Sequence, residues 1–336
     1  NRQGIVIGAF GFAGVLLSHN IIGMISGYFL IVFLLILLVI SVIPSPRGST
    51  SGTSNVPATF DCGAHPRGVF KALLFTFLLG FGLSAFFTLP AIFEKDFTRV
   101  NELVIGSSNF SNHFVYLDQL WSSPWGYAGS APGRLDGMSF MIGKIHLLLG
   151  FLSIPIVLIF HKRKKINSSQ FFPKSGTIFI LMLAVFLISV FLMLEQSKFI
   201  WEILPGFAFI QYPWRFLVYT TLSLSIMISI MFVSFNRITQ IILGVFLIAV
   251  IIWFNSRYFI PKEYLALKSE DYTDVTNLRF KISKISDEYL PGDFTIVDSP
   301  QNISWQTMTD TQNIKIIDSI ENPTKKIFTV DSAYSN

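Results

Sequence analysis

The chain has 336 residues, of which 51% are hydrophobic and 13% charged, and its formal net charge is +5. Such a composition is typical of a membrane protein. A single cysteine, Cys62, excludes an intrachain disulfide and a thiolate metal cluster. The basic residues gather at the ends of apolar runs, so we expect no nucleic-acid partner.

Several apolar stretches come near the roughly 20 residues that a helix needs to cross a bilayer. Seven such spans lie at about 4–18, 21–43, 69–92, 138–160, 176–195, 213–235 and 238–256. They predict an α-helical polytopic membrane protein whose transmembrane domain covers residues 1–256. The chain starts at Asn1 within apolar sequence, and we interpret it as a fragment cut at both ends that lacks the N-terminal part of the protein.

Lys and Arg in the short loops predict the orientation of the spans. The inner, cytoplasmic side receives loop 44–68, which is rich in Ser, Gly and Pro, and the "HKRKK" block at 161–165. The outer side receives loop 93–137, segment 196–212 and the tail. Most carboxylates outside the tail fall on this outer side, so we expect any chemistry there. The aromatic residues of the outer loop predict one or two short interfacial helices, for instance around 111–121.

Residues 257–336 change in character. The runs "FTIVD", "NISW", "IKIID" and "KIFTV" favour strands, and turn clusters such as "LPGD" and "ENPTK" separate them. The tail therefore predicts a small extracytoplasmic domain, mostly β and incomplete where the chain stops. Its acidic residues outnumber its Lys and Arg, which again does not favour a nucleic-acid binder.

Four motifs occur in a collinear order that resembles a known group: "LPAIFEKDFT" (89–98), "SSPWGYAGSAPGRLDGMSF" (122–140), "FAFIQYPWRFL" (207–217) and "DEYLPGDF" (287–294). The chain resembles the prokaryotic polytopic proteins named after a 6-pyruvoyl-tetrahydropterin synthase-related membrane domain, close to YfhO-like proteins. These are similar to the GT-C superfamily of glycosyltransferases, which take a sugar from a polyprenyl-phosphate carrier at the outer membrane face. The resemblance implies a GT-C-like fold in the cytoplasmic membrane and an envelope acceptor. It also implies a catalytic Asp in a first outer loop that would precede Asn1.

Arg215 lies in "FIQYPWRFL" at the outer start of the sixth span. One interpretation is an interfacial anchor formed by Tyr212, Trp214 and Arg215. The other is a phosphate-binding site, in which the planar guanidinium and the neighbouring Gln211 hold a lipid phosphate at a helix start. We favour phosphate binding because the cluster belongs to the motif that the resemblance rests on.

Two acidic residues are our candidates for catalysis. Glu94, with Asp96 two residues on, could polarise a sugar hydroxyl or bind a divalent metal ion, or it could form a solvated helix end. A divalent metal is the one cofactor we consider, and its ligands stay open. Asp136 follows the glycine-rich "WGYAGSAPGRLDG", where a substrate could approach the backbone closely, although an N-cap role fits equally.

Four further residues are candidates for substrate contact. Lys144 would hold phosphate from within the fourth span and, with His146, would meet a carboxylate such as Glu195. His19 closes an outer turn, where it could contact substrate or cap a helix. Trp125 and Tyr127 could stack on a sugar ring or anchor the loop in the interface.

The resemblance implies a membrane glycosyltransferase that moves a sugar from a polyprenyl-phosphate-linked donor to an envelope acceptor on the outer face, and the candidate residues above would form its site. The partners would be membrane lipid, that donor and an acceptor of unknown identity. One alternative is a transporter of lipid-linked precursors, which would need polar residues facing a path through the bilayer. The spans at 21–43, 176–194 and 238–254 contain almost none, which counts against it. Another is a non-catalytic envelope assembly protein whose tail binds a partner.

Overall fold

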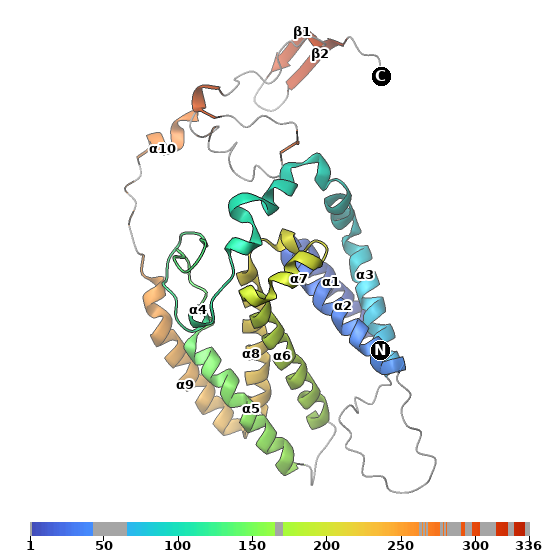
Figure 1. Ribbon diagram of the computed structural model, residues 1–336, viewed down its shortest axis with the longest axis vertical. Coiled ribbons are helices and arrows are strands. Elements are labelled where there is room, and N and C mark those ends of the chain that lie inside the picture. The colour runs from blue at the N-terminus through green and yellow to red at the C-terminus, as the bar shows by residue number, and fades with distance from the viewer. Residues whose placement is uncertain are drawn as a thin grey trace. The chain divides into compact units, whose positions relative to one another are not determined.

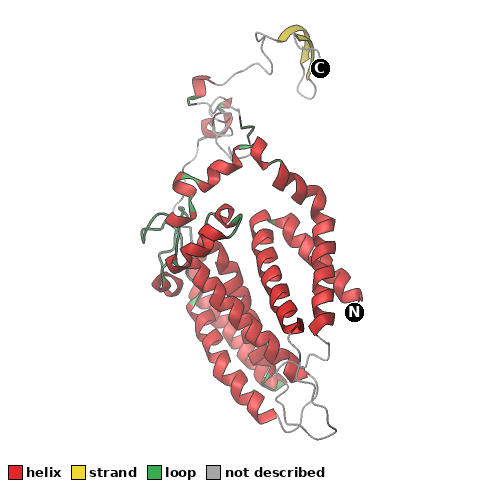
Figure 2. Cartoon of the chain, turned by 45° about the vertical axis from the view of Figure 1, so that its right-hand side comes forward, coloured by secondary structure: helices red, strands yellow, loops and turns green. Residues whose placement is uncertain are grey.

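The computed structural model describes residues 2–42, 66–164 and 171–261, and after them shorter runs: 264, 266, 268–275, 278, 280, 290–292, 298–302, 314–321 and 326–332. The chain divides into two compact units, Asn1–Glu263 and Tyr264–Asn336. Helices make up the first unit, and a strand pair is the main element of the second (Figures 1 and 2).

Long apolar helices dominate the first unit: α1 (Arg2–Ser18), α2 (Asn20–Val42), α3 (Pro66–Phe93), α5 (Lys144–Lys164), α6 (Phe171–Met193), α8 (Leu217–Val233) and α9 (Arg237–Asn255). Five stretches of the described chain are long and apolar enough to cross a membrane: Asn20–Leu38, Gly68–Phe93, Ser175–Met193, Pro213–Val233 and Arg237–Phe259. They indicate a multi-pass membrane protein, and five of the seven predicted spans thus form helices long and apolar enough to cross a membrane. The first and fourth predicted spans form apolar helices that are shorter, Arg2–Ser18 and Lys144–Phe160.

The fourth predicted span begins later than the sequence indicated, at Lys144 instead of 138. Phe140 and Ile142 are apolar because they are buried in protein, not because they face lipid. The Ile142 amide donates to the Leu120 carbonyl oxygen at 3.1 Å, which ties this stretch to the preceding loop. Hydropathy does not distinguish these two kinds of apolar environment.

Successive long helices run in opposite directions, so their connections gather at two ends of the unit (Figure 1). We call one of them the loop end; it holds residue 19 and residues 94–143, 194–216 and 256–261. Short helical turns build it: η1 (Lys95–Phe97), η2 (Arg99–Val104), η3 (Gly106–Ser108), η4 (Phe110–Asn112), α4 (Leu117–Trp121), η5 (Glu195–Ser197), α7 (Lys198–Ile203), η6 (Phe207–Ile210), η7 (Pro213–Phe216) and η8 (Ser256–Phe259). The short helix predicted around 111–121 is confirmed by α4.

Small residues let helices approach closely within two groups. In the group α1–α3, a Cβ at Gly80 of α3 would lie 2.9 Å from the Ala9 carbonyl oxygen of α1. In the group α5, α6 and α8, a Cβ at Gly150 of α5 would clash with a methyl carbon of Leu224 in α8. Close approach through small residues is a common way for helices to associate in membranes.

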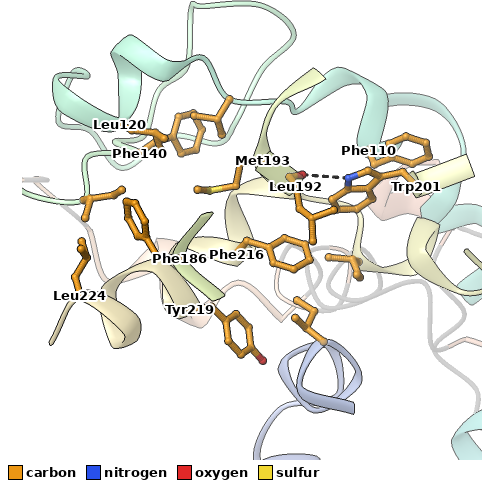
Figure 3. Close-up of a cluster of buried hydrophobic side chains, with 14 of the residues drawn as sticks. Phe110, Leu120, Phe140, Phe186, Leu192, Met193, Trp201, Phe216, Tyr219 and Leu224 are labelled. Carbon is orange, nitrogen blue, oxygen red and sulfur yellow. Dashed lines mark hydrogen bonds between the residues drawn. The ribbon is translucent and has the colours of Figure 1, made fainter. Parts of the chain in front are cut away.

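An aromatic core at the loop end joins the loop between α3 and α5 to the helices (Figure 3). Phe110 of the loop stacks on Trp201 of α7 at 5.3 Å between ring centroids. The Trp201 indole Nε1 donates to the Leu192 carbonyl oxygen of α6 at 3.1 Å. The two helix groups also meet directly, because Tyr219 of α8 donates its hydroxyl to the Ile22 carbonyl oxygen of α2 at 2.9 Å.

The second unit contains an antiparallel strand pair, β1 (Ile314–Glu321) and β2 (Lys326–Ser332). Ile314 lies opposite Ser332, Glu321 lies opposite Lys326, and the register shifts between Ile316 and Asp318. The strands predicted from "IKIID" and "KIFTV" are confirmed. The runs "FTIVD" and "NISW" lie for the most part outside the described residues. The described tail also holds α10 (Glu270–Thr273) and η10 (Pro300–Asn302).

Candidate functional site

The segment Phe209–Leu217, which we call the arginine segment, connects η6 to α8. It contains a tight turn at Gln211, which is buried and has φ +62° and ψ −48°. The Tyr212 amide closes this turn by donating to the Ile210 carbonyl oxygen at 2.6 Å. A γ-turn with positive φ is strained for a residue other than glycine. Strain of this kind persists only where the surrounding structure holds it.

Arg215 is part of what holds the turn. Its Nη1 donates to the same Ile210 carbonyl oxygen at 2.6 Å, and to Gln211 Oε1 at 3.3 Å. Its guanidinium also lies over the Tyr212 ring, 4.9 Å from the centroid. The guanidinium is therefore fixed to its own segment, and Gln211 and Arg215, which the sequence predicts as a phosphate-binding pair, are in contact.

A second cation reaches the arginine segment from the other helix group. Lys95, in the turn after α3, places its Nζ over the Phe209 ring at 4.7 Å from the centroid. The sequence pointed to its neighbours Glu94 and Asp96 and not to Lys95 itself. Glu94 is exposed, and its carboxylate has no hydrogen-bond or ion-pair partner among the described residues. Asp96 accepts a hydrogen bond from Asn101 Nδ2 at 2.9 Å.

Asp136 lies in a different environment, since only 8% of its surface is exposed. Its Oδ2 accepts from Gln119 Nε2 at 2.8 Å, and its Oδ1 accepts from the Ala131 amide at 3.0 Å and Ser130 Oγ at 3.2 Å. Gln119 also ties down the loop, because its Oε1 accepts from the Tyr116 amide at 3.0 Å. The carboxylate thus organises the loop between α3 and α5, and its hydrogen-bond partners among the described residues include neither Glu94 nor Arg215.

His113 extends this arrangement to the arginine segment, and no sequence pattern pointed to it. It is 4% exposed, and its Nδ1 lies 3.0 Å from Ser130 Oγ. Its ring meets the Tyr212 ring edge to face, with centroids 4.7 Å apart. The sequence placed it only within the short helix expected around 111–121, which does not reveal a contact with a residue about a hundred positions away.

Trp214 offers one unsatisfied group at the site. Its ring stacks between Tyr212 and Phe140, with centroids 5.4 and 6.3 Å away. Its indole Nε1 is buried and has no hydrogen-bond acceptor among the described residues. Buried donors in proteins nearly always have a partner, so a bound water or a ligand oxygen is expected beside this nitrogen.

Trp125 and Tyr127 contact each other, with centroids 6.1 Å apart, and Trp125 also contacts Tyr258 beyond α9 at 4.7 Å. The glycine-rich loop that carries them folds onto itself. A Cβ at Gly126 would clash with the Gly137 carbonyl oxygen, and the Ala128 amide donates to that oxygen at 3.1 Å. Glycine at position 126 therefore allows the two sides of the loop to approach.

Lys144 and His146 do not meet Glu195, contrary to our expectation. Lys144 is exposed at the first turn of α5, with its Nζ 5.7 Å from the Trp121 ring centroid. His146 Nε2 lies 3.0 Å from Ser225 Oγ of α8. His19 forms the contact expected of a helix cap: its Nδ1 accepts a long hydrogen bond of 3.4 Å from the Ile22 amide.

Every described Lys and Arg at the loop end contacts a carboxylate or an aromatic ring. The ion pairs are Arg99–Glu102, Arg134–Asp118 and Lys198–Glu202. The bases over rings outside these pairs are Lys95, Arg215 and Arg257. Lys144, at the start of α5 next to the loop end, lies over the Trp121 ring. Within the described part of the chain, no group of three or more His, Cys, Asp or Glu could hold a metal ion.

Comparison of the chain with protein-family models, with curated proteins and with solved structures gave no match.

Proposed function

We propose that this chain belongs to a membrane glycosyltransferase of the GT-C type, which uses a polyprenyl-phosphate-linked sugar donor at the outer face of a prokaryotic cytoplasmic membrane. The observation that carries the proposal is the convergence of two cations on one short segment. Lys95 comes from η1, directly after α3, and Arg215 from η7, directly before α8, and both lie on rings of the arginine segment. The reaction type comes from the resemblance of the four motifs to the YfhO-like proteins.

The chemistry around the arginine segment suits a phosphate linked to a lipid. Ammonium and guanidinium groups form the strong, charge-assisted hydrogen bonds that phosphate oxygens accept. The Lys95 ammonium has no carboxylate partner among the described residues, and the buried Trp214 Nε1 is a further donor. The surrounding rings of Phe209, Tyr212 and Trp214 match an interfacial depth, where a polyprenyl chain enters the bilayer and its phosphate stays at the surface.

The two acids take different places in this proposal. Glu94 is exposed next to Lys95, so it is the acid we propose to contact the sugar. Asp136 accepts hydrogen bonds at both oxygens and is buried, which suits a structural anion better than a group that exchanges protons with substrate. Trp125, Tyr127, Lys144 and His19 form no hydrogen bond or ring contact with the arginine segment within the described chain, and a role in substrate binding stays a prediction for them.

Binding of polyprenyl phosphate to the full chain in lipid nanodiscs tests the proposal. We expect the wild type to bind polyprenyl phosphate and to bind polyprenol, which lacks the phosphate, much more weakly. Each lost hydrogen bond to a charged group removes about 1.5–3 kcal/mol, so Lys95→Ala should weaken binding about tenfold or more. Lys198→Ala is the matched control, because Lys198 pairs with Glu202 at the same end.

A turnover assay with a polyprenyl-phosphate sugar completes the test. Glu94→Gln should lower turnover more than it lowers donor affinity, since the substitution preserves size and removes only the charge. Equal affinity for polyprenol and polyprenyl phosphate, or an unchanged affinity in a folded Lys95→Ala variant, would contradict the proposal.

A transporter of lipid-linked precursors is less well supported, because several buried serine hydroxyl groups within the spans bond to their own helices, although Ser189 Oγ has no hydrogen-bond partner among the described residues. Ser84, Ser153 and Ser223 each donate to a carbonyl oxygen of their own helix, at 3.2, 2.6 and 2.5 Å. Hydroxyl groups satisfied in this way do not provide a polar path for a headgroup.

An assembly protein without catalysis is the second candidate, and the β1–β2 pair favours it. Ile317, Ile327 and Val330 of these strands are exposed, which leaves apolar surface available to a protein partner. Absence of donor turnover in the complete protein, together with loss of envelope assembly when Ile317 and Val330 are replaced by Ser, would select this function.

A further inference from the structure

We propose that Asp136 is a positioning residue for the phosphate site, acting through Ser130 and His113 on Tyr212 and so on Arg215. We call Gln119, Asp136, Ser130 and His113 the cap network. The inference rests on the proposed function for what Arg215 binds, but the coupling itself concerns only residues of this chain. It assigns roles to His113 and Ser130, and it makes Asp136 structural to the site instead of a group that touches substrate.

The first step of the coupling follows from the single hydroxyl proton of Ser130. An ionised carboxylate only accepts hydrogen bonds, so the Ser130 hydroxyl donates its single proton to Asp136 Oδ1 at 3.2 Å. The Ser130 oxygen is then the acceptor for His113, and the His113 Nδ1 carries the proton that spans the 3.0 Å between them. Asp136 therefore fixes the direction of both hydrogen bonds and the tautomer of the imidazole.

The second step is mechanical contact between rings. The fixed His113 ring meets Tyr212 edge to face at 4.7 Å, and the Tyr212 ring lies under the Arg215 guanidinium at 4.9 Å. Tyr212 also supplies the amide that closes the strained turn at Gln211. Two groups hold Arg215: the Tyr212 ring and the Ile210 carbonyl oxygen. A shift of His113 would displace both of them through Tyr212.

A parallel route through the same loop provides a control. Ser123 Oγ accepts from the Phe140 amide at 2.8 Å, and Phe140 stacks on Trp214, which stacks on Tyr212. Ser123 and Ser130 are both partly exposed serines of the outer loop. Ser123→Ala removes one hydrogen bond to Phe140, but Phe140 is 1% exposed and stays held by core packing, so the stack on Trp214 and Tyr212 is kept. Only Ser130→Ala interrupts the cap network.

The hydrogen bonds also permit a rescue that separates positioning from chemistry. In Asp136→Asn, one side-chain atom becomes an amide nitrogen that faces the donor Gln119 Nε2, so two donors meet. In the double variant Gln119→Glu with Asp136→Asn, the new carboxylate accepts from the new amide and from the Tyr116 amide. The side-chain oxygen that remains at position 136 still accepts from Ser130 and Ala131. The pattern of donors and acceptors is restored, while the negative charge has moved from position 136 to position 119.

The experiment measures two quantities on the full chain in nanodiscs. The first is hydrogen exchange of peptides covering 207–217, which should be about tenfold faster in Asp136→Asn and Ser130→Ala than in wild type. Ser123→Ala should leave it within about twofold. The second is polyprenyl phosphate affinity, which should fall in Asp136→Asn and return to within about twofold of wild type in the double variant. Thermal unfolding of each variant verifies that it is folded.

The outcomes separate this inference from the proposed function. Unchanged exchange at 207–217 in a folded Ser130→Ala variant would overturn the coupling, and so would equal acceleration in Ser123→Ala. If the double variant restores exchange but not affinity, the carboxylate at 136 itself contacts the ligand and the positioning role is wrong. If exchange responds as expected and wild type does not bind polyprenyl phosphate, the coupling stands and the proposed function fails.

Discussion

Two arginines of the first unit form the same pair with tyrosine and have different surroundings. The Arg215 and Arg257 guanidinium groups lie 4.9 Å from the ring centroids of Tyr212 and Tyr258, respectively. Arg215 is partly buried and donates to a backbone carbonyl oxygen at 2.6 Å, whereas Arg257 is exposed and donates to the Tyr258 hydroxyl at 2.9 Å. Ring geometry alone therefore does not identify a site, and the added contact with a strained backbone does.

The helices that carry the two pairs differ in the same way. In the membrane-length stretch that includes Arg215, 39% of its apolar 18-residue window is buried, and in the one that includes Arg257 none is, although the mean hydropathies are 2.1 and 2.3. α8 packs on both α5 and α6, so its start is held against protein. We infer that Arg257 has the role of an interfacial anchor, which was one of the two interpretations of Arg215.

The largest effect is expected for Arg215→Ala. The substitution removes a charge-assisted bond to the Ile210 carbonyl oxygen and leaves the turn at Gln211 without its cation, at a cost of about 3 kcal/mol. Apparent thermal unfolding in nanodiscs measures this loss. Arg215→Lys should recover part of it, since an ammonium group can reach one oxygen but lacks the planar fork. A folded Arg215→Ala variant with wild-type stability would remove the distinction between the two arginines.

A somewhat smaller effect is expected for Gly126→Ala in the loop that carries Trp125. The added methyl group would clash with the Gly137 carbonyl oxygen, so the loop must shift at a cost of about 2 kcal/mol. Gly129→Ala is the matched control, because a Cβ there meets nothing within 4 Å. Protease sensitivity of the loop and thermal unfolding should separate the two variants, and equal behaviour would contradict the self-packing of the loop.

The strain at Gln211 is measurable from two substitutions at that position. Both Gln211→Ala and Gln211→Gly remove the acceptor of the 3.3 Å hydrogen bond, but only glycine adopts φ +62° without steric cost. We expect the glycine variant to be about 1 kcal/mol more stable than the alanine variant. An alanine variant at least as stable as the glycine variant would show that the turn is not strained.

The smallest effect is expected for Arg257→Ala. Exposed side chains away from special backbone contribute within about 0.5 kcal/mol. Stability and polyprenyl phosphate affinity should both stay near wild type. A large loss of affinity in this variant would move the phosphate site toward Trp125, Tyr127 and Tyr258.

Local patterns in the sequence predicted the elements well where one environment dominates a stretch. Five spans, the short helix α4 and the strands β1 and β2 were predicted in this way. The start of α5 was predicted too early, because the apolar residues Phe140 and Ile142 are buried in the loop-end core and do not belong to the helix. A hydropathy window counts such residues as part of the span that follows them.

The candidate site was only partly predictable, for a physical reason. The contact between Gln211 and Arg215 is local, because the two residues are four positions apart in the sequence, and the motif contained both of them. The cap network joins Gln119 to Asp136 and His113 to Ser130, each pair 17 residues apart across a folded loop. Contacts of this length follow neither helical nor strand periodicity, so Ser130 and His113 carried no signal. The contact of Lys95 with Phe209 could not be predicted for the same reason, since the two residues are far apart in the sequence.

The Ile210 carbonyl oxygen accepts from the Tyr212 amide and from Arg215 Nη1, both at 2.6 Å. Its stretching frequency therefore depends on how strongly the guanidinium is engaged elsewhere. A phosphate that draws the cation away would leave this oxygen with one donor, and the carbonyl band would move to higher wavenumber. An isotope label on this one peptide group would thus turn the backbone into an infrared reporter of anion binding, without any probe attached to the protein.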